Sequence, residues 1–100
     1  MERPYYAAIF TSSRAEGDHG YAEMVRHMET LAQQEPGYLG IESAREDTGI
    51  TVSYWKSLEA IAHWKANTDH LFAQFKGKTD RYKWCNVRIC LVERGYDFHT

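Results

Sequence analysis

The sequence predicts an α+β fold: a ferredoxin-like βαββαβ arrangement in which two helices cover one face of a four-stranded antiparallel sheet. Aromatic and β-branched runs occur at four places along the chain, apolar residues recur at helical spacing at two, and turn residues separate these six segments. A chain of 100 residues has room for one hydrophobic core, so we expect residues 1–100 to form a single domain.

Composition and spacing predict the first strand and the first helix. Tyr5–Thr11 is aromatic and apolar without helical spacing, which is typical of a strand, and the polar segment Ser12–Gly17 is expected to be a loop. Asp18 is a suitable N-cap, and Glu35-Pro36-Gly37 ends the helix because proline disfavours helix in the residue before it. Between these limits the apolar residues recur at intervals of three and four: Tyr21, Met24, Val25, Met28, Leu31 and Ala32.

Three further strands are predicted, two of them as a hairpin. Tyr38–Arg45 alternates in character, Ile50–Trp55 is rich in β-branched and aromatic residues, and residues 46–49 supply a turn. Trp84–Arg94 is the last strand, and its side chains alternate between two faces. One face carries Cys85, Val87, Ile89 and Leu91, and the other carries Asn86, Arg88 and Cys90. Because its two cysteines point apart, we expect free thiols rather than a disulfide.

The second helix is predicted in two pieces. Ser57 can cap its start, and the polar side chains of residues 67–69 compete for backbone hydrogen bonds, so a break is expected there. A further helical piece then runs from His70 to about Lys76. The apolar side of the first piece consists of Leu58, Ile61, Ala62 and Trp64.

Charge and hydropathy exclude several classes of partner. The chain has 12 Lys and Arg against 14 Asp and Glu, with no basic block, so we expect no nucleic-acid partner. No apolar run approaches the roughly 18 residues of a membrane-spanning helix. The apolar segment near the N-terminus is too short for a signal peptide, so a cytoplasmic protein is expected.

The predicted strands are apolar or aromatic on both faces, which indicates a partner. Neighbouring residues such as Tyr54 and Trp55 point to opposite faces, so the face without helices also carries apolar and aromatic side chains. With 14% aromatic residues, a monomer would expose a large apolar patch. We therefore expect a homodimer that packs through its sheet faces.

Aromatic residues gather around the second helix and the last strand and are typical of a small-molecule pocket. There His70 could move a proton near neutral pH, and Arg88 could stabilise an anion. A simpler interpretation is that the aromatics are core and His70 is structural. His63 and His70 have only Asp69 beside them, so no metal site is expected. The candidate catalytic residues are His70, Trp64 and Arg88, and the candidate substrate contacts are Phe10, Tyr54, Phe72, Phe75 and Trp84.

Three stretches of the chain resemble the antibiotic biosynthesis monooxygenase family. They are Thr51–Ile61 followed by Trp64 and His70, then Gln34–Ser43, and finally Val87–Arg94. The resemblance extends from about Tyr5 to Tyr96, and it implies a dimeric ferredoxin-like α+β barrel.

The resemblance also implies an activity. It suggests a cofactor-independent monooxygenase that oxidises a small aromatic or polyketide-like phenol or quinol with O₂, in an apolar pocket between helices and sheet. Trp64 matches the family's helix tryptophan, His70 falls where a polar pocket residue lies, and Arg88 is a looser match to a strand arginine. One helical turn before the tryptophan, Ala60 replaces a polar residue.

Two other functions remain open at this stage. One is a non-catalytic dimer that binds an aromatic metabolite. The other is haem degradation, for which the resembling branch uses Asn, Trp and His. Here Gln74 stands at the His position and Phe10 and Thr11 stand at the Asn position, so two of the three residues are missing.

Overall fold

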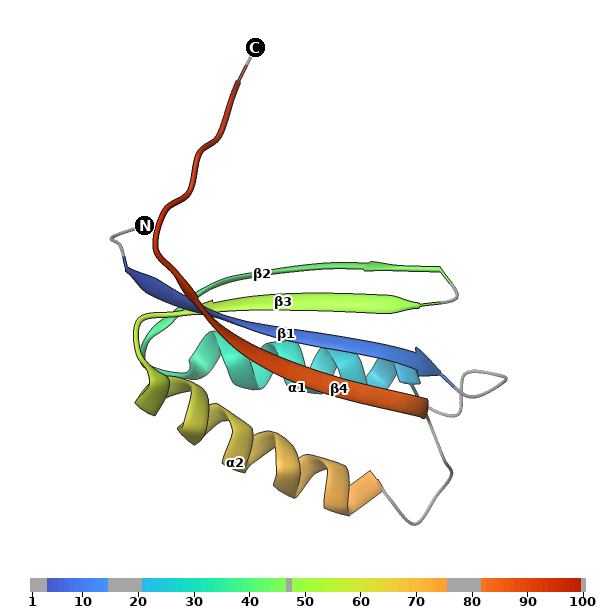
Figure 1. Ribbon diagram of the computed structural model, residues 1–100. Coiled ribbons are helices and arrows are strands. Elements are labelled where there is room, and N and C mark those ends of the chain that lie inside the picture. Colours follow the sequence, from blue (N-terminus) through green and yellow to red (C-terminus); the bar gives the residue numbers. More distant parts are fainter. Residues whose placement is uncertain (1–3, 15–20, 47, 76–81, 100) are drawn as a thin grey trace.

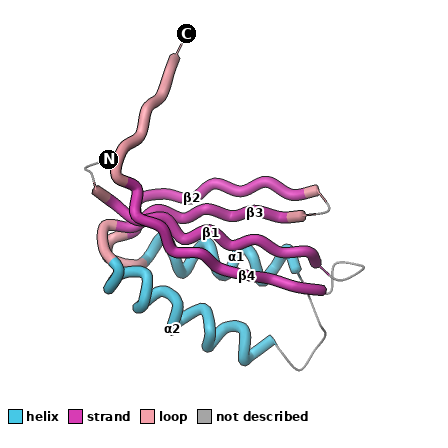
Figure 2. Tube along the Cα trace, viewed as in Figure 1, coloured by secondary structure: helices cyan, strands magenta, loops and turns pink. Residues whose placement is uncertain are grey.

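The computed structural model describes residues 4–14, 21–46, 48–75 and 82–99, with the backbone alone for residues 14, 21–25, 45, 69–75 and 82–85. Two helices lie on one side of a four-stranded antiparallel sheet whose strand order is β2-β3-β1-β4 (Figures 1 and 2). This arrangement confirms the predicted ferredoxin-like fold. Its elements are β1 (Tyr5–Arg14), α1 (Tyr21–Gln34), β2 (Tyr38–Arg45), β3 (Gly49–Trp55), α2 (Leu58–Phe75) and β4 (Tyr82–Val92).

The strand register defines which residues face the helices. In antiparallel strands, directly opposed residues share a face. Trp55 is fully buried and packs with Trp64 of α2, so the residues in register with it also face the helices. Tyr6 and Leu91 occupy that position on β1 and β4. The core on this face consists of Ala8, Ala32, Trp55 and Ile61.

The link from α1 to β2 requires glycine. Gly37 has a φ of 91°, a conformation that side chains with a Cβ rarely adopt. A Cβ at this position would also lie 2.8 Å from the Cβ of Ala60, so α2 packs directly against the turn. The carbonyl of Gly37 accepts a hydrogen bond of 2.9 Å from the backbone N–H of Lys56. The end of α1 and the approach to α2 are therefore joined at one point.

The start of α2 confirms the predicted cap, but the predicted break is wrong. The hydroxyl of Ser57 accepts a hydrogen bond of 3.1 Å from the Ala60 N–H. The helix then continues unbroken from Leu58 to Phe75. The hydroxyl of Thr68 bonds to the Lys65 carbonyl at 2.9 Å, and the amide of Asn67 bonds to Glu35. Because both polar side chains find partners without displacing the helical backbone, they do not interrupt the helix.

Two strands are longer toward the same end of the sheet than the sequence predicts. Ser12, expected in a loop, is fully buried and pairs with Gly49 and Cys85. The β1–β4 ladder continues to Arg14 opposite Tyr82. Pairing with neighbours on both sides satisfies the backbone groups of this polar segment, which its composition alone does not reveal. At its other end β4 stops at Val92 rather than at Arg94.

The two cysteines lie on opposite faces, as predicted. Cys85 is in register with Ser12 on the helix side, and Cys90 is in register with Ala7 on the other side. Cys90 is a half-buried free cysteine. Among the described residues, no helix has the length and apolar character needed to cross a bilayer.

The core depends on Trp55, and its removal is expected to destabilise the protein severely. Trp55→Ala should lower the free energy of unfolding by about 3–5 kcal/mol, because a fully buried aromatic side chain is lost and a cavity remains. Urea denaturation followed by far-UV circular dichroism, at one protein concentration, measures the change. Leu58→Ala is the control, since Leu58 is 52% exposed on α2, and it should change stability by less than about 1 kcal/mol. Equal effects of the two substitutions would contradict the assigned core.

Candidate functional site

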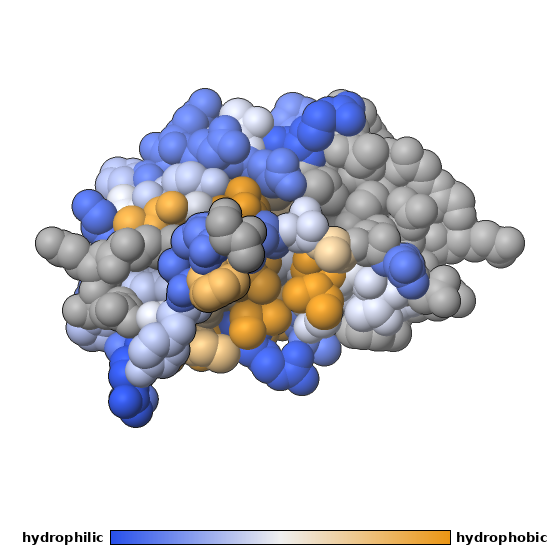
Figure 3. All heavy atoms as spheres, turned by 90° about the horizontal axis from the view of Figure 1, so that it is seen from above, coloured by the Kyte–Doolittle hydropathy of each residue, from blue (hydrophilic) through white to orange (hydrophobic). Residues whose placement is uncertain are grey.

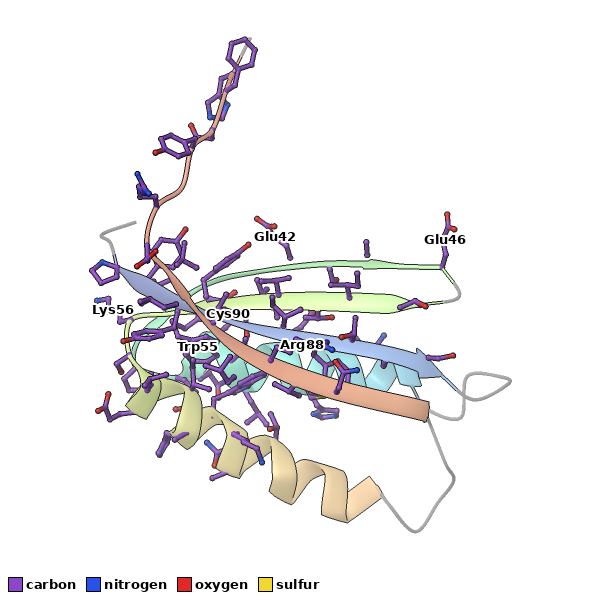
Figure 4. All side chains as sticks on the ribbon, viewed as in Figure 1. Glu42, Glu46, Trp55, Lys56, Arg88 and Cys90 are labelled. Carbon is purple, nitrogen blue, oxygen red and sulfur yellow. The ribbon has the colours of Figure 1, made fainter. Side chains whose placement is uncertain are left out.

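A tryptophan pair joins α2 to the sheet. The rings of Trp55 and Trp64 lie 5.1 Å apart between centroids and are tilted by 31°. Tyr38 meets Trp55 edge to face at 5.8 Å. Figure 4 shows Trp55 between the sheet and α2. Aromatic pairs of this kind add stability beyond their buried area, so Trp64 is held in a defined position.

The two indole N–H groups differ in their partners. Nε1 of Trp55 donates a hydrogen bond of 2.8 Å to the hydroxyl of Ser53. Nε1 of Trp64 is also buried, but no acceptor among the described residues is within its reach. Buried indole N–H groups usually have a partner. A hydrogen-bond donor is thus present beneath the sheet that an oxygen atom of a bound molecule could satisfy.

Apolar side chains of β4 line the same side of the sheet. Val87, Ile89 and Leu91 are in register with helix-facing residues of β1, yet they are 52%, 45% and 49% exposed. In Figure 1, α2 runs below β4 on the helix side of the sheet. Phe10, a predicted substrate contact, is half-buried on this face opposite Val87. Among the described residues, the helix-facing side thus offers exposed apolar side chains on β4 and, against Trp55 of β3, a buried donor without an acceptor; apolar lining with a few polar groups is a feature of small-molecule sites.

Arg88 lies on the opposite face of the sheet from Trp64. It is in register with Ile9, between the helix-facing residues Val87 and Ile89. Its guanidinium donates to the Asn86 side-chain oxygen at 2.6 Å and to the Thr11 hydroxyl at 3.4 Å. The expectation that Arg88 shares one pocket with Trp64 is not met within one chain, because adjacent strand residues point to opposite faces.

Tyr54, another predicted substrate contact, also points away from the helices. It neighbours the buried Trp55 and is in register with Gly40 and Ala7. Its hydroxyl donates to a carboxylate oxygen of Glu42 at 3.5 Å. Partial burial, and then the negative charge of Glu42, raise the pKa of the Tyr54 phenol above its usual value of 10.0. Tyr54 therefore stays neutral across physiological pH.

The remaining predicted site residues have side chains outside the described part of the structure. His70, Phe72 and Phe75 belong to α2, and Trp84 is in register with Ser13. The sequence analysis predicted that Trp64 and His70 line the same side of the pocket, on the condition that the helix breaks between them. Because α2 is continuous, six residues separate their backbone positions by about 240° around the helix axis.

A buried carboxylate that the sequence did not single out fastens α2 to the end of α1. The side chain of Glu35 is only 7% exposed. It accepts a hydrogen bond of 2.5 Å from Nδ1 of His63 and another from the amide of Asn67. These two residues are four apart on α2 and flank Trp64 in sequence. Their i, i+4 spacing was a signal for a shared partner. Among the described residues, no group of three or more His, Cys, Asp or Glu side chains could hold a metal ion.

Comparison with known proteins identifies relatives that cover most of the chain. A family model described as "Antibiotic biosynthesis monooxygenase" matches residues 4–75. Over 95 residues the chain is 48% identical to the uncharacterized protein YqjZ of Bacillus subtilis (strain 168). That match covers 93% of this chain and 83% of the relative.

Solved structures share the fold at low sequence identity. A mutant of SnoaB, a cofactor-independent oxygenase from Streptomyces nogalater, superposes with a TM-score of 0.75 at 7% identity, over 92% of this chain and 96% of that one. The monooxygenase of the gene ActVA-Orf6 from Streptomyces coelicolor, in complex with Nanaomycin D, gives 0.68 at 14% identity, over 98% and 95%. NE2512 of Nitrosomonas europaea, a protein of unknown function, gives 0.72 at 11% identity, over 97% of each chain.

Removing the Glu35 carboxylate is expected to loosen α2. Glu35→Ala should lower the free energy of unfolding by about 1–3 kcal/mol, because His63 and Asn67 lose their partner. It should also weaken the near-UV circular dichroism of the Trp55–Trp64 pair. Glu46→Ala is the control, since this exposed carboxylate lies at the far end of the β2–β3 hairpin (Figure 4). Equal stability and equal near-UV spectra for the two variants would show that Glu35 does not hold the helix.

Proposed function

Because the chain belongs to the antibiotic biosynthesis monooxygenase family, we propose that it is a cofactor-independent monooxygenase acting on a small aromatic phenol or quinol with O₂. The substrate would bind on the helix-facing side of the sheet, between α2 and β4. The observation that carries this proposal is the buried N–H of Trp64, which has no acceptor among the described residues.

The proposed oxidation requires a phenolate anion that is shielded from water. Loss of the phenolic proton makes the ring electron-rich, so that it can reduce O₂ itself. One oxygen atom becomes the new quinone carbonyl and the other leaves as water, and the four electrons come from the ring. In this scheme His70 accepts the phenolic proton, because imidazole titrates near neutral pH. Since Trp64 and His70 are about 120° apart by the shorter way round the continuous helix, the two would act on the phenol from different sides. The N–H of Trp64 hydrogen-bonds the developing phenolate oxygen, an interaction that is strong where water is excluded.

Other observations favour this side of the sheet for the reaction. Val87, Ile89 and Leu91 offer the apolar surface that an aromatic ring would cover. The indole of Trp64 is fixed by stacking on Trp55, so its N–H needs little reorganisation when the anion forms. Arg88 lies on the other face within the same chain, so in the proposed mechanism Trp64 rather than Arg88 carries the hydrogen bond to the anion.

Oxygen uptake with a panel of hydroquinones and phenols tests the proposal. Trp64→Phe keeps an aromatic ring but removes the N–H, and it should lower kcat by about 10- to 100-fold, the loss expected for one hydrogen bond to a charged group. His70→Ala should lower kcat by about 10²- to 10⁴-fold, the usual contribution of a general base. His99→Ala, at an exposed position, should leave the rate unchanged.

Two outcomes would contradict this function. If no compound in the panel is oxidised while mass spectrometry finds an aromatic metabolite bound to the purified protein, the chain is a binding module. If haem copurifies and is degraded, the haem branch is the correct one. Equal rates for the parent, Trp64→Phe and His70→Ala would refute the roles of both residues.

We also propose that the protein is a homodimer that packs through the sheet face away from the helices, called here the outer face. Apolar side chains on this face include Ile50, which is 45% exposed, and the half-buried Ile9, Val52 and Val92. Figure 3 shows apolar side chains gathered near the middle of the surface seen from above, bordered by hydrophilic ones. Covering such a patch with a second copy removes it from water.

A charge placed on the outer face is expected to dissociate the dimer. Ile50→Asp should shift the protein from twice the chain mass of 11.7 kDa toward the monomer in sedimentation equilibrium, since an unpaired carboxylate would be buried. Leu58→Asp is the matched control, because Leu58 is similarly exposed, at 52%, but belongs to the first turn of α2, where an acid is favourable. A parent protein that sediments at the monomer mass at all concentrations would refute the homodimer.

A further inference from the structure

Glu42 and Arg88 occupy the two ends of one row across the outer face. The register places Glu42 opposite Val52, Val52 opposite Ile9, and Ile9 opposite Arg88. Because opposed residues share a face, the four side chains cross all four strands at one level. The row thus reads acid, apolar, apolar, base from β2 to β4.

Both charged ends of this row are exposed, and among the described residues neither has an ionic partner. Glu42 accepts a hydrogen bond from the phenol of Tyr54, and Arg88 donates to the neutral side chains of Asn86 and Thr11. Within the part of the chain that the structure describes, neither has an oppositely charged neighbour. In Figure 4, Glu42 projects from β2 away from the helices, and Arg88 lies on β4 beside β1.

This row is complementary in charge to the same row of a second copy when the order of the strands is reversed. Consider a two-fold axis that lies between two facing sheets, runs parallel to the strands and passes over the gap between β3 and β1. This axis places β2 of one copy over β4 of the other and keeps each residue at the same position along the strand direction. Glu42 of each copy then lies over Arg88 of the other, and Val52 lies over Ile9. Packed sheets lie about 10 Å apart, a gap that long glutamate and arginine side chains can bridge from opposite sides. The same contact occurs twice, as an interface with two-fold symmetry requires.

The other face-to-face arrangement is disfavoured by charge. A two-fold axis running across the strands would place β2 over β2 and β4 over β4. If that axis passed at the level of the row, Glu42 would lie over the other copy's Glu42, and Arg88 over its Arg88; at any other level the unlike charges would still lie at opposite edges of the sheets. Like charges opposed across an interface are strongly unfavourable, so the row discriminates between the two arrangements.

Side-chain size and the course of the chain support the same axis. The neighbouring row runs Gly40, Tyr54, Ala7 and Cys90, so this axis places the large Tyr54 over the small Ala7 of the second copy. Residues 93–99 leave β4 and rise on the side of the sheet away from the helices (Figure 1). They carry Tyr96 and Phe98, each 86% exposed. A second copy in this position would lie beside these aromatic side chains.

We propose that a second copy of the chain docks on the outer face with its strands aligned by two reciprocal Glu42–Arg88 ion pairs, which set the register of the dimer. This inference rests on the homodimer proposed above and adds its axis and its specificity. The ion pairs act mainly by excluding other arrangements, while the apolar centre of the row supplies the buried surface.

Charge reversal in the 100-residue chain tests the proposal. Glu42→Arg alone and Arg88→Glu alone each oppose like charges twice, so each should raise the dimer Kd at least about 10-fold in sedimentation equilibrium. An equimolar mixture of the two variants should recover the dimer, because every pair in the heterodimer is again of opposite sign. The doubly substituted chain should also dimerise within about threefold of the parent, and the parent dimer should weaken as salt is raised.

Glu46→Arg is the control for added charge, since Glu46 is exposed in the hairpin turn outside the row, and it should dimerise like the parent. If the parent is a dimer but the mixed variants associate no better than each alone, the proposed register is wrong while the homodimer stands. If the parent is monomeric, both the homodimer and the proposed register are refuted. The monooxygenase proposal is decided separately, by oxygen uptake.

Discussion

The stacking of Trp64 on Trp55 is the contact on which the rest of the structure depends. Trp55 is the largest fully buried side chain of the described residues, and it belongs to a central strand of the sheet. The contact fixes which face of every strand meets the helices, because each strand is in register with its neighbours. It also places the indole N–H of Trp64 beneath the sheet, where apolar side chains of β4 remain half exposed.

The position of α2 is secured at its start and along its first turns by contacts with the end of α1. Gly37 lets the turn approach Ala60 closely, and its carbonyl binds the N–H of Lys56 just before the helix. Two turns later the buried carboxylate of Glu35 binds His63 and Asn67. The tripeptide 35–37 therefore does more than end α1, since its first residue binds α2 and its last gives α2 room to pack.

The two faces of the sheet have different chemical characters. The helix-facing side combines buried aromatic rings with an indole donor, and it suits a small aromatic ligand. The outer face combines apolar side chains with charges of opposite sign at its two margins, and it suits a symmetric partner. Since a strand residue can serve only one face, Arg88 and Tyr54 cannot contribute to the helix side of their own chain.

Local patterns in the sequence were enough to predict six elements in their order, the cap at Ser57 and the alternation along β4, because each depends on neighbouring residues only. Local patterns failed where a distant residue decides the outcome. Asn67 and Thr68 indicated a break in α2, yet Glu35, 32 residues before Asn67, takes up the Asn67 amide and the helix continues. The alternation of β4 separated Val87 from Arg88, but only the register with β1 and the packing of Trp55 on Trp64 decided which of them faces the helices. The sequence alone thus determined the elements and their periodicity, whereas tertiary packing decided which residues meet, because contacts between faces join segments that are far apart along the chain.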